Sequence, residues 1–362
     1  CFVSQHIGDV ENGGTFDAWN AARTRLEDLF DLAPAALACD LHPSYLSDQW
    51  AREQARKCNL PLVEVQHHHA HIASVMAEAI AAGQLTTDTR VLGIAFDGTG
   101  AGTDGTIWGG EFLVASLDGF ERTAHLLTWA LPGGAASVRD ARRNAFALLS
   151  ELGLLEHPGA AQLLDSLDEQ TRSVTATMIE RGINSPRTSS MGRLFDAAAA
   201  ILGICDKATY EGEPAIELEA AAWRAFSSES ACPTGNMVSF SVTESSRPDD
   251  CHVLNSRPLF EALLEGIRTG VPAGKLALDF HVTIARSSAR IAREICAREG
   301  LDTVALSGGV FMNRLLLQLL TRELKSMGLT VLIPRSVPVN DGCIAYGQAV
   351  IARARLAQTA SR

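Results

Sequence analysis

The chain contains two segments with the same order of elements: an apolar strand, a helix, a second strand, a polar turn and a second helix. In the first segment we expect these elements over residues 35–39, 45–57 and 61–65, with the last helix ending near 82. In the second segment we expect them over residues 303–306, 312–327, 330–334 and 343–355. Leu37 and Val63 are 26 residues apart, and Val304 and Val331 are 27 residues apart. This matched spacing indicates one strand-helix-strand-turn-helix unit that occurs twice.

A repeated unit of this kind predicts an α/β protein with two lobes. Parallel strands joined by helices wind right-handed and lie in a sheet whose faces are covered. Two such units suggest lobes related by a pseudo-twofold axis, with a cleft between them. Both units carry their polar cluster directly after the second strand, over 66–71 and 339–342. Ligand sites of α/β sheets lie at the carboxyl ends of strands, so we expect the site there.

The remaining segments complete a two-lobe organisation. We predict a first lobe over residues 1–88 and a second over 89–362, with a helical insertion at about 137–260. Further strands are expected over 91–97, 106–116 and 121–129, a surface excursion over 227–257, and an amphipathic helix over 279–299.

Composition excludes several classes of protein. Hydrophobic residues make up 46% and charged residues 20% of the 362 residues, which is ordinary for a globular chain. The net charge of −11 argues against sequence-independent nucleic-acid binding, which needs a basic surface. We find no apolar stretch long enough for a membrane span and no signal peptide, so we expect a cytoplasmic protein. The eight cysteines are never closer than 19 residues, which excludes a Cys-x-x-Cys pair.

Four histidines within five residues form the first candidate site. His67 and His71 are four residues apart, so on a helix their imidazoles point the same way, the spacing that holds a metal ion. Residue 68 is His rather than Glu, so the general base of the zincin motif is absent. A stable site needs a third ligand. The equivalent point of the second unit is Asp341, and two histidines with a carboxylate suit Fe(II) or Zn(II).

The second candidate site is a glycine-rich turn over 97–105. Gly100, Gly102 and Gly105 satisfy the dinucleotide-binding spacing, but the following residues alternate as a strand where that fold needs a helix. We therefore predict a hairpin loop, in which Asp97 and the glycines could cradle phosphate through backbone N–H groups.

The third candidate site lies at the end of the strand over 303–306. Ser307 stands in a sequence close to the nucleophile elbow, but a hydrolase of that fold needs a histidine downstream, and the last histidine is His281. Gly308 and Gly309 instead allow a ligand to approach a helix N-terminus, with Asn313 one turn further on. No Walker sequence is present, so a P-loop NTPase is excluded.

Two weaker motifs lie in the helical region. Arg193 and Asp196 are three residues apart at a helix start, a spacing equally explained by a salt bridge. Glu211 stands in a turn before a helix, where an acidic residue also favours the helix dipole.

Taken together, the motifs resemble a known family. Five segments, 4–9, 39–43, 65–71, 96–100 and 306–313, with the turn over 339–342, are similar to the carboxy-terminal carbamoyltransferase domain of the NiFe-hydrogenase maturation factor HypF. The resemblance runs from residue 1 to about residue 355. It implies a bilobal actin-like ATPase fold of the ASKHA or RNase H-like type, with two pseudo-symmetric lobes and a helical insertion in the second. This fold agrees with the repeated unit.

The resemblance also implies an activity. HypF uses ATP and carbamoyl phosphate to make carbamoyl-adenylate, and then passes the carbamoyl group to the carboxy-terminal cysteine of HypE, on the route to the cyanide ligands of the hydrogenase iron. The expected partners are therefore a HypE-type acceptor and a YrdC-like adenylate-forming domain, which this sequence does not contain. Neither nucleic acid nor a membrane is expected as a partner.

The resemblance assigns roles residue by residue. His67, His71 and Asp341 match metal ligands, and magnesium is expected with the nucleotide. The nucleotide-side residues are a larger set: Asp97, Gly98, Thr99 and Gly100 of the hairpin, Ser307, Gly308, Gly309 and Asn313 of the glycine motif, and the weaker matches Asp196 and Glu211.

Two departures and two alternatives remain. The actin-like fold opens each lobe with a β-hairpin, and residue 1 is expected to begin at the third strand of the first lobe. Without its adenylate-forming domain, the chain is expected to perform the second half-reaction. The alternatives are a small-molecule O-carbamoyltransferase and a nucleotide-binding scaffold without catalysis of its own.

Overall fold

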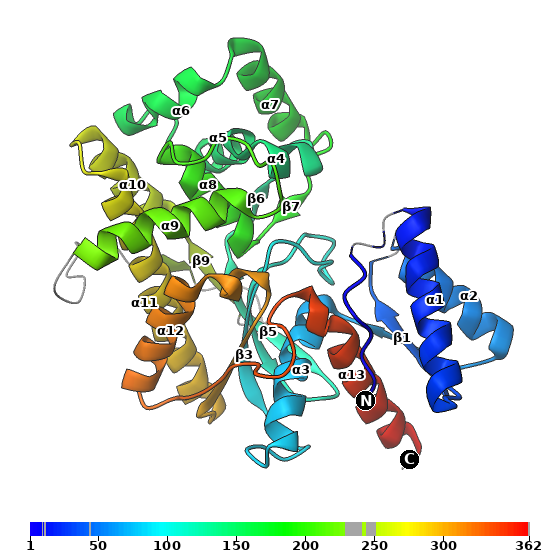
Figure 1. Cartoon of the computed structure of the whole chain (residues 1–362). Helices are drawn as coiled ribbons and strands as arrows, with labels where there is room; N and C mark the ends of the chain where they lie inside the picture. Colours follow the sequence, from blue (N-terminus) through cyan, green and yellow to red (C-terminus); the bar gives the residue numbers. More distant parts are fainter. Residues whose placement is uncertain (9, 11, 43–44, 229–240, 244–250, 361–362) are drawn as a thin grey trace.

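The computed structural model describes residues 1–8, 10, 12–42, 45–228, 241–243 and 251–360 (Figure 1). The helices are α1 Gly13–Phe30, α2 Leu46–Cys58, α3 His67–Ala81, α4 Ala135–Arg139, α5 Ala141–Glu151, α6 Ala161–Ser166, α7 Glu169–Arg181, α8 Met191–Ile201, α9 Glu213–Ser228, α10 Arg257–Arg268, α11 Ala273–Glu299, α12 Arg314–Ser326 and α13 Ile344–Ala360. Three short 3-10 helices are η1 Pro158–Ala160, η2 Gly309–Met312 and η3 Asp341–Cys343.

A seven-stranded mixed sheet forms the centre of the protein. In sheet order its strands are β11 Thr330–Leu332, β10 Thr303–Ser307, β3 Val91–Phe96, β4 Gly110–Ala115, β5 Phe120–Leu126, β9 His252–Asn255 and β8 Ser241–Thr243. Strand β10 runs parallel to both β11 and β3, whereas β3, β4 and β5 form an antiparallel meander. Two further two-stranded sheets consist of β1 Leu37–Asp40 with β2 Leu62–Val65, and β6 Trp129–Ala130 with β7 Arg187–Thr188.

Helices cover both faces of the central sheet, which explains why its strand β3 is apolar throughout. Leu92, Ile94 and Phe96 of β3 belong to a large core that also contains residues of α8, α11 and α12. Val91 and Ala95 belong to a second core with residues of α3 and α13. Successive side chains of a strand point to opposite faces, so both sets must be apolar.

The predicted repeat is present in the structure. Strands β1 and β2 pair in parallel with Leu37 opposite Leu62, and β10 and β11 pair in parallel with Thr303 opposite Thr330. Helix α2 connects the first pair and α12 the second, and each unit ends in a helix, α3 or α13. These two equivalent helices pack against each other. The repeat therefore brings the starts of α3 and α13 to one place.

The amino-terminal region differs from the prediction. Helix α1 was not expected, because only Ala22 of its residues is buried and its sequence shows no clear apolar stripe. Residues 1–8 form no strand, and the first strand among the described residues is β1, which follows this helix, so the expectation that residue 1 begins at the third strand of a lobe is wrong.

The predicted helical insertion is only partly helical. The described residues of 137–260 include three short strands, and two of them, β8 and β9, extend the central sheet beyond β5. The predicted surface excursion over 227–257 therefore contains a sheet edge, while its residues 229–240 and 244–250 lie outside the described part of the chain.

Helix α13 packs on β1, β2 and α3. The lobe boundary at 88/89 stays a prediction. None of the described helices has the length and apolar content needed to cross a membrane.

Candidate metal centre

The two candidate histidines stand at the start of α3. The helix begins directly after β2, and Gln66 caps it, since its side-chain oxygen accepts a hydrogen bond from the His69 N–H at 2.9 Å. His67 and His71 are one turn apart and both are buried. As the spacing predicts, their rings lie on one face, with centroids 5.0 Å apart.

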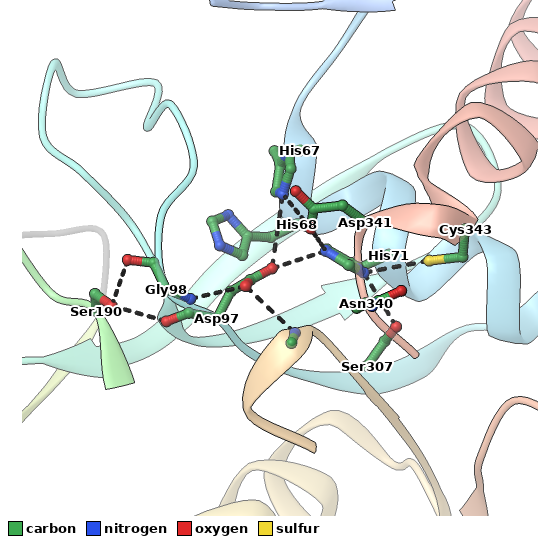
Figure 2. Close-up of polar contacts among 12 residues, drawn as sticks. His67, His68, His71, Asp97, Gly98, Ser190, Ser307, Asn340, Asp341 and Cys343 are labelled. Carbon is green, nitrogen blue, oxygen red and sulfur yellow. Dashed lines mark hydrogen bonds and ion pairs between the residues drawn. The ribbon is translucent and has the colours of Figure 1, made fainter. Parts of the chain in front are cut away.

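Four side chains converge at this point. His67, His71, Asp97 and Asp341 each offer a ligand atom, and these atoms all lie within 4.8 Å of one another. The Nε2 atom of His71 is 2.8 Å from Asp97 Oδ2 and 3.4 Å from Asp341 Oδ1. The Nε2 atom of His67 is 3.6 Å from each of these oxygens. Figure 2 shows the four side chains pointing toward one centre from α3, the end of β3 and η3.

The polar atoms of this cluster fit a divalent metal ion. His67 Nε2, His71 Nε2 and Asp97 Oδ2 are buried and have no hydrogen-bond partner of good geometry within the described protein. A buried polar atom without a partner costs about 1–3 kcal/mol. Imidazole nitrogens with carboxylate oxygens are the donors that Fe(II) and Zn(II) accept. A metal ion would satisfy all three atoms at once.

The cluster reaches solvent at Asp341. The Asp341 side chain is 69% exposed, whereas that of His71 is fully buried. Asp341 opens η3, which Asn340 caps by accepting a hydrogen bond from the Gly342 N–H at 3.2 Å. An ion or a substrate can therefore approach from the Asp341 side.

Attraction between the histidines and the carboxylates shifts the pKa values of the cluster residues when no metal ion is bound. Burial lowers the pKa of His67, but the carboxylates of Asp341, Asp40 and Asp97 outweigh it and raise that pKa well above its usual value. Burial also lowers the pKa of His71, but the carboxylates of Asp341 and Asp97 outweigh it and raise that pKa well above its usual value. Burial raises the pKa of Asp97, but the two histidines outweigh it and hold the pKa well below its usual range. Without a metal ion the histidines are therefore protonated partners of ionised carboxylates.

Asp97 is the functional candidate whose position the sequence did not reveal. The prediction placed it in a phosphate-binding hairpin, whereas the structure also brings its Oδ2 atom to the histidines. Its other oxygen accepts hydrogen bonds from the Gly98 N–H at 2.7 Å and the Gly309 N–H at 3.3 Å. The available signal was its place at the carboxyl end of an apolar strand, which is also where Asp40 and Ser307 stand.

The glycine-rich turn is a hairpin loop, as predicted. It joins the antiparallel strands β3 and β4, so the dinucleotide-binding interpretation is excluded by the structure as well. The start of α8 fixes its first residues, because the Ser190 hydroxyl lies 2.7 Å from the Asp97 carbonyl and 2.8 Å from that of Gly98. Thr99 is exposed, and Gly100 is buried, where a Cβ atom would come 2.5 Å from His68 Cε1. The loop therefore packs directly on the histidine turn.

The glycine motif after β10 also contacts the cluster. Gly308 has a φ of +109°, and a Cβ atom there would overlap the Phe96 carbonyl oxygen, so only glycine fits. Ser307 places its hydroxyl 3.2 Å from His71 Nδ1. Asn313 caps α12 by accepting a hydrogen bond from the Leu316 N–H at 2.8 Å, and its amide nitrogen lies 2.9 Å from His281 Nε2. Both polar atoms of the Asn313 side chain therefore have hydrogen-bond partners within the protein.

The two weaker candidates lie further from the centre. Asp196 is buried and forms an ion pair with Arg193 at 3.0 Å, while its Oδ1 atom has no hydrogen-bond partner within the described residues. Burial raises the pKa of Asp196, and the nearby Glu211 carboxylate adds to the effect. Glu211 itself is exposed. The structure brings neither residue into the four-ligand cluster.

The other two histidines of the motif lie outside the four-ligand cluster. The Nε2 atom of His69 lies 2.8 Å from the Ser116 carbonyl oxygen. His68 packs beside the hairpin, and its Nδ1 atom lies 3.1 Å from the Gln66 amide nitrogen. Burial lowers the pKa of His68 to about 3 and that of His69 to about 4, so both rings are neutral.

Two family models together match most of the chain. Residues 1–78 match the HypF Kae1-like domain, and residues 93–348 match the second subdomain of the carbamoyltransferase Kae1-like domain. The chain is 36% identical to carbamoyltransferase HypF2 of Cupriavidus necator over 377 residues, covering 98% of this chain and 44% of that protein. It is 39% identical to a carbamoyltransferase HypF homolog of the same organism over 350 residues, covering 95% of this chain and 84% of that protein.

Solved structures agree with these matches. A crystal structure of full-length HypF in the phosphate- and nucleotide-bound form matches with a TM-score of 0.86 and 35% identity, covering 97% of this chain and 43% of that one. The HypF of T. kodakarensis matches with a TM-score of 0.82 and 32% identity, covering 98% of this chain and 45% of that one. The predicted actin-like fold is thereby confirmed. This chain spans less than half the length of most of these relatives.

Proposed function

The chain belongs to the HypF family, and on this premise we propose that it transfers a carbamoyl group during NiFe-hydrogenase maturation. The proposed donor is carbamoyl-adenylate, made from ATP and carbamoyl phosphate by a YrdC-like domain. The proposed acceptor is the carboxy-terminal cysteine of a HypE-type protein, and the proposed location is the cytoplasm. The observation that carries the proposal is the convergence of four ligand atoms at the carboxyl end of β3, beside the hairpin loop.

The proposed transfer is an exchange of one acyl bond for another. The acceptor thiolate attacks the carbamoyl carbon, a C–S bond forms, and the C–O bond to the AMP phosphate breaks. The products are the S-carbamoyl cysteine, AMP and the proton that left the thiol. Since the carbamoyl group enters already activated, orientation and charge stabilisation account for most of the rate.

The residues of the chain divide this task. His67, His71, Asp97 and Asp341 would hold a divalent ion, Fe(II) or Zn(II), which supplies Lewis-acid stabilisation to a carbamoyl or phosphate oxygen. Thr99 of the hairpin loop is exposed, and backbone N–H groups of this loop could receive phosphate.

The nucleotide side of the proposal rests on fewer contacts. A full-length HypF has been solved with phosphate and nucleotide bound, which supports nucleotide binding by this chain. We place ATP or carbamoyl-adenylate, with magnesium, near Gly308 and Gly309. Asp196 and Glu211 remain candidates on that side. Asn313 is proposed to act there by fixing the start of α12, because its side chain already bonds within the protein.

The test is the intact mass of a HypE-type acceptor. The acceptor is incubated with this chain, ATP, carbamoyl phosphate and a separate YrdC-like domain, and carbamoyl-adenylate is verified by chromatography. We expect one carbamoyl adduct on the terminal cysteine, absent without this chain. His71→Gln should abolish the adduct, because it removes a ligand nitrogen. His69→Gln is the matched control on the same helix, since His69 bonds the Ser116 carbonyl outside the cluster.

Two other results would favour one of the alternative functions. No adduct in the presence of carbamoyl-adenylate would exclude the HypE-type acceptor and favour a small-molecule acceptor. Undiminished transfer by His71→Gln would show that the cluster has no part in the reaction, as in a scaffold.

A further inference from the structure

Equivalent residues of the repeat contact the Nδ1 atoms of the two ligand histidines, on the side of each ring away from the cluster. His67 Nδ1 lies 3.1 Å from Asp40 Oδ2, and His71 Nδ1 lies 3.2 Å from Ser307 Oγ. Asp40 is the last residue of β1, and Ser307 is the last residue of β10. When Leu37 is aligned with Val304, as the repeat requires, Asp40 aligns with Ser307. The same structural position therefore supplies both contacts, once as a carboxylate and once as a hydroxyl.

The contact at Nδ1 decides what Nε2 can do. A neutral imidazole carries one proton, so a ring that donates from Nδ1 presents a lone pair at Nε2. Asp40, when ionised, can only accept, and it therefore keeps the proton of His67 on Nδ1. The Nε2 lone pair is then directed at the cluster. A carboxylate behind a histidine also makes the ring a more basic ligand.

Asp40 is itself fixed in place. It is buried, and its Oδ1 atom accepts a hydrogen bond from the His42 N–H at 3.0 Å, which leaves Oδ2 for His67. Its backbone N–H donates to Asp48 Oδ1 at 3.2 Å. Both side-chain oxygens of Asp40 are thus committed, so an amide at this position could serve only one of its two donors.

The partner of His71 is weaker. The Ser307 hydroxyl is neutral, and it can donate a hydrogen bond to the Val339 carbonyl oxygen, 3.4 Å away, while its oxygen accepts from His71. His71 Nδ1 also has the Cys343 sulfur at 3.3 Å, which can accept in place of the hydroxyl. The two histidines are therefore supported unequally, with the charged partner behind His67.

We propose that Asp40 is a positioning residue for the metal centre, which holds His67 in the tautomer whose Nε2 atom binds the ion. This inference rests on the proposed metal site. Ser307 has the same task for His71, with a smaller share in affinity because a second acceptor stands beside it.

The test measures Co(II) affinity of the purified full chain by absorption titration against a competing chelator. In Asp40→Asn we expect affinity to fall about 10–100-fold, the usual effect of losing such a partner. The amide oxygen would take the His42 N–H, and the amide nitrogen would then face Nδ1 and drive the proton to Nε2. Ser307→Ala should lose less than about 10-fold.

A matched control and a second measurement separate positioning from folding. Asp48→Asn changes a buried aspartate that accepts a hydrogen bond from the backbone N–H of Asp40 and does not contact a ligand histidine, and it should bind Co(II) as the wild type does. Thermal melts of the metal-free proteins check that each variant folds. In zinc-loaded protein labelled with 15N at histidine, NMR should show a protonated Nδ1 at His67 in the wild type and its loss in Asp40→Asn.

The outcomes distinguish this inference from the proposed function. If the wild type binds no Co(II), the metal site fails and the inference fails with it. If the wild type binds Co(II) and Asp40→Asn binds equally well, with an unchanged His67 signal, only the inference is overturned. A loss of affinity as large in Asp48→Asn would likewise overturn it, since the effect would then belong to the local fold.

Discussion

At the residue scale, the pKa shifts of the two ligand histidines link the metal centre to pH. The pKa of each histidine is higher in the folded protein than in the unfolded chain, where it is about 6.5. The protonated histidines therefore stabilise the metal-free fold fully below about pH 6.5, and this stabilisation is lost as the pH rises through the pKa values of the folded state. We expect thermal melts of chelator-treated protein to show falling stability as pH increases above about 7. Metal-loaded protein should lack this decline, because the bound ion replaces the protons. A decline of equal size in both forms would contradict the assignment.

A second prediction at this scale concerns Asp97. Asp97→Asn keeps an oxygen for the N–H groups of Gly98 and Gly309, but places an amide nitrogen where Oδ2 faces His71. Loss of a residue that only supports a metal ligand usually lowers metal affinity about 10–100-fold. Because Asp97 is itself a ligand, its loss should lower Co(II) affinity by at least as much. Asp104→Asn is the control, since Asp104 lies in the same loop but bonds Trp108 and Arg122. Unchanged affinity in Asp97→Asn would remove Asp97 from the ligand set.

At the element scale, the contact between α3 and α13 sets the distance from Asp341 to the histidines. Gly347 of α13 packs on the Ala70 carbonyl, which lies between His67 and His71, and a Cβ atom there would overlap that oxygen. Gly347→Ala should therefore push α13 away from α3. We expect a loss of about 1–3 kcal/mol in stability, as for overpacking, together with weaker Co(II) binding.

The comparison for this variant is another helical Gly→Ala change. Gly13 in α1 has no atom within 4 Å of an added Cβ, so Gly13→Ala should leave metal binding unchanged. Urea denaturation and Co(II) titration of both variants check the prediction. Loss of stability without loss of affinity in Gly347→Ala would mean that the helix contact does not position Asp341.

At the scale of the whole molecule, the ligands come from distant parts of the chain. His67 stands in the first unit of the repeat, Asp97 at the end of β3, and Asp341 before the last helix. An ion bound by all of them stabilises only the assembled fold. At a free metal concentration of about 100 times Kd, the free energy of unfolding should rise by about 2.7 kcal/mol. Denaturation with and without metal measures this, and Asp341→Asn should show a much smaller rise.

Local patterns in the sequence determined the repeat and three of the four cluster residues. Helical spacing places His67 and His71 on one face whatever surrounds them, because a turn of helix is set by the backbone. The repeat then identified Asp341 as the equivalent of this turn, and the structure brings it to 3.4 Å from His71. Helix α1 escaped the same approach, since an exposed helix carries no apolar period to detect.

Only the tertiary structure decided the rest of the site. Asp97 joins the histidines because β3 pairs with β10 in one register and α3 crosses that sheet, and Gly93 lets α3 approach so closely that a Cβ there would meet Ile72. Asp40 reaches His67 across 27 residues, and Ser307 reaches His71 across 236. Such contacts depend on strand register and helix crossing, which are set by packing between segments far apart in the chain. The sequence by itself therefore determined which residues could bind a metal ion, and the packing of the two units decided which of them meet.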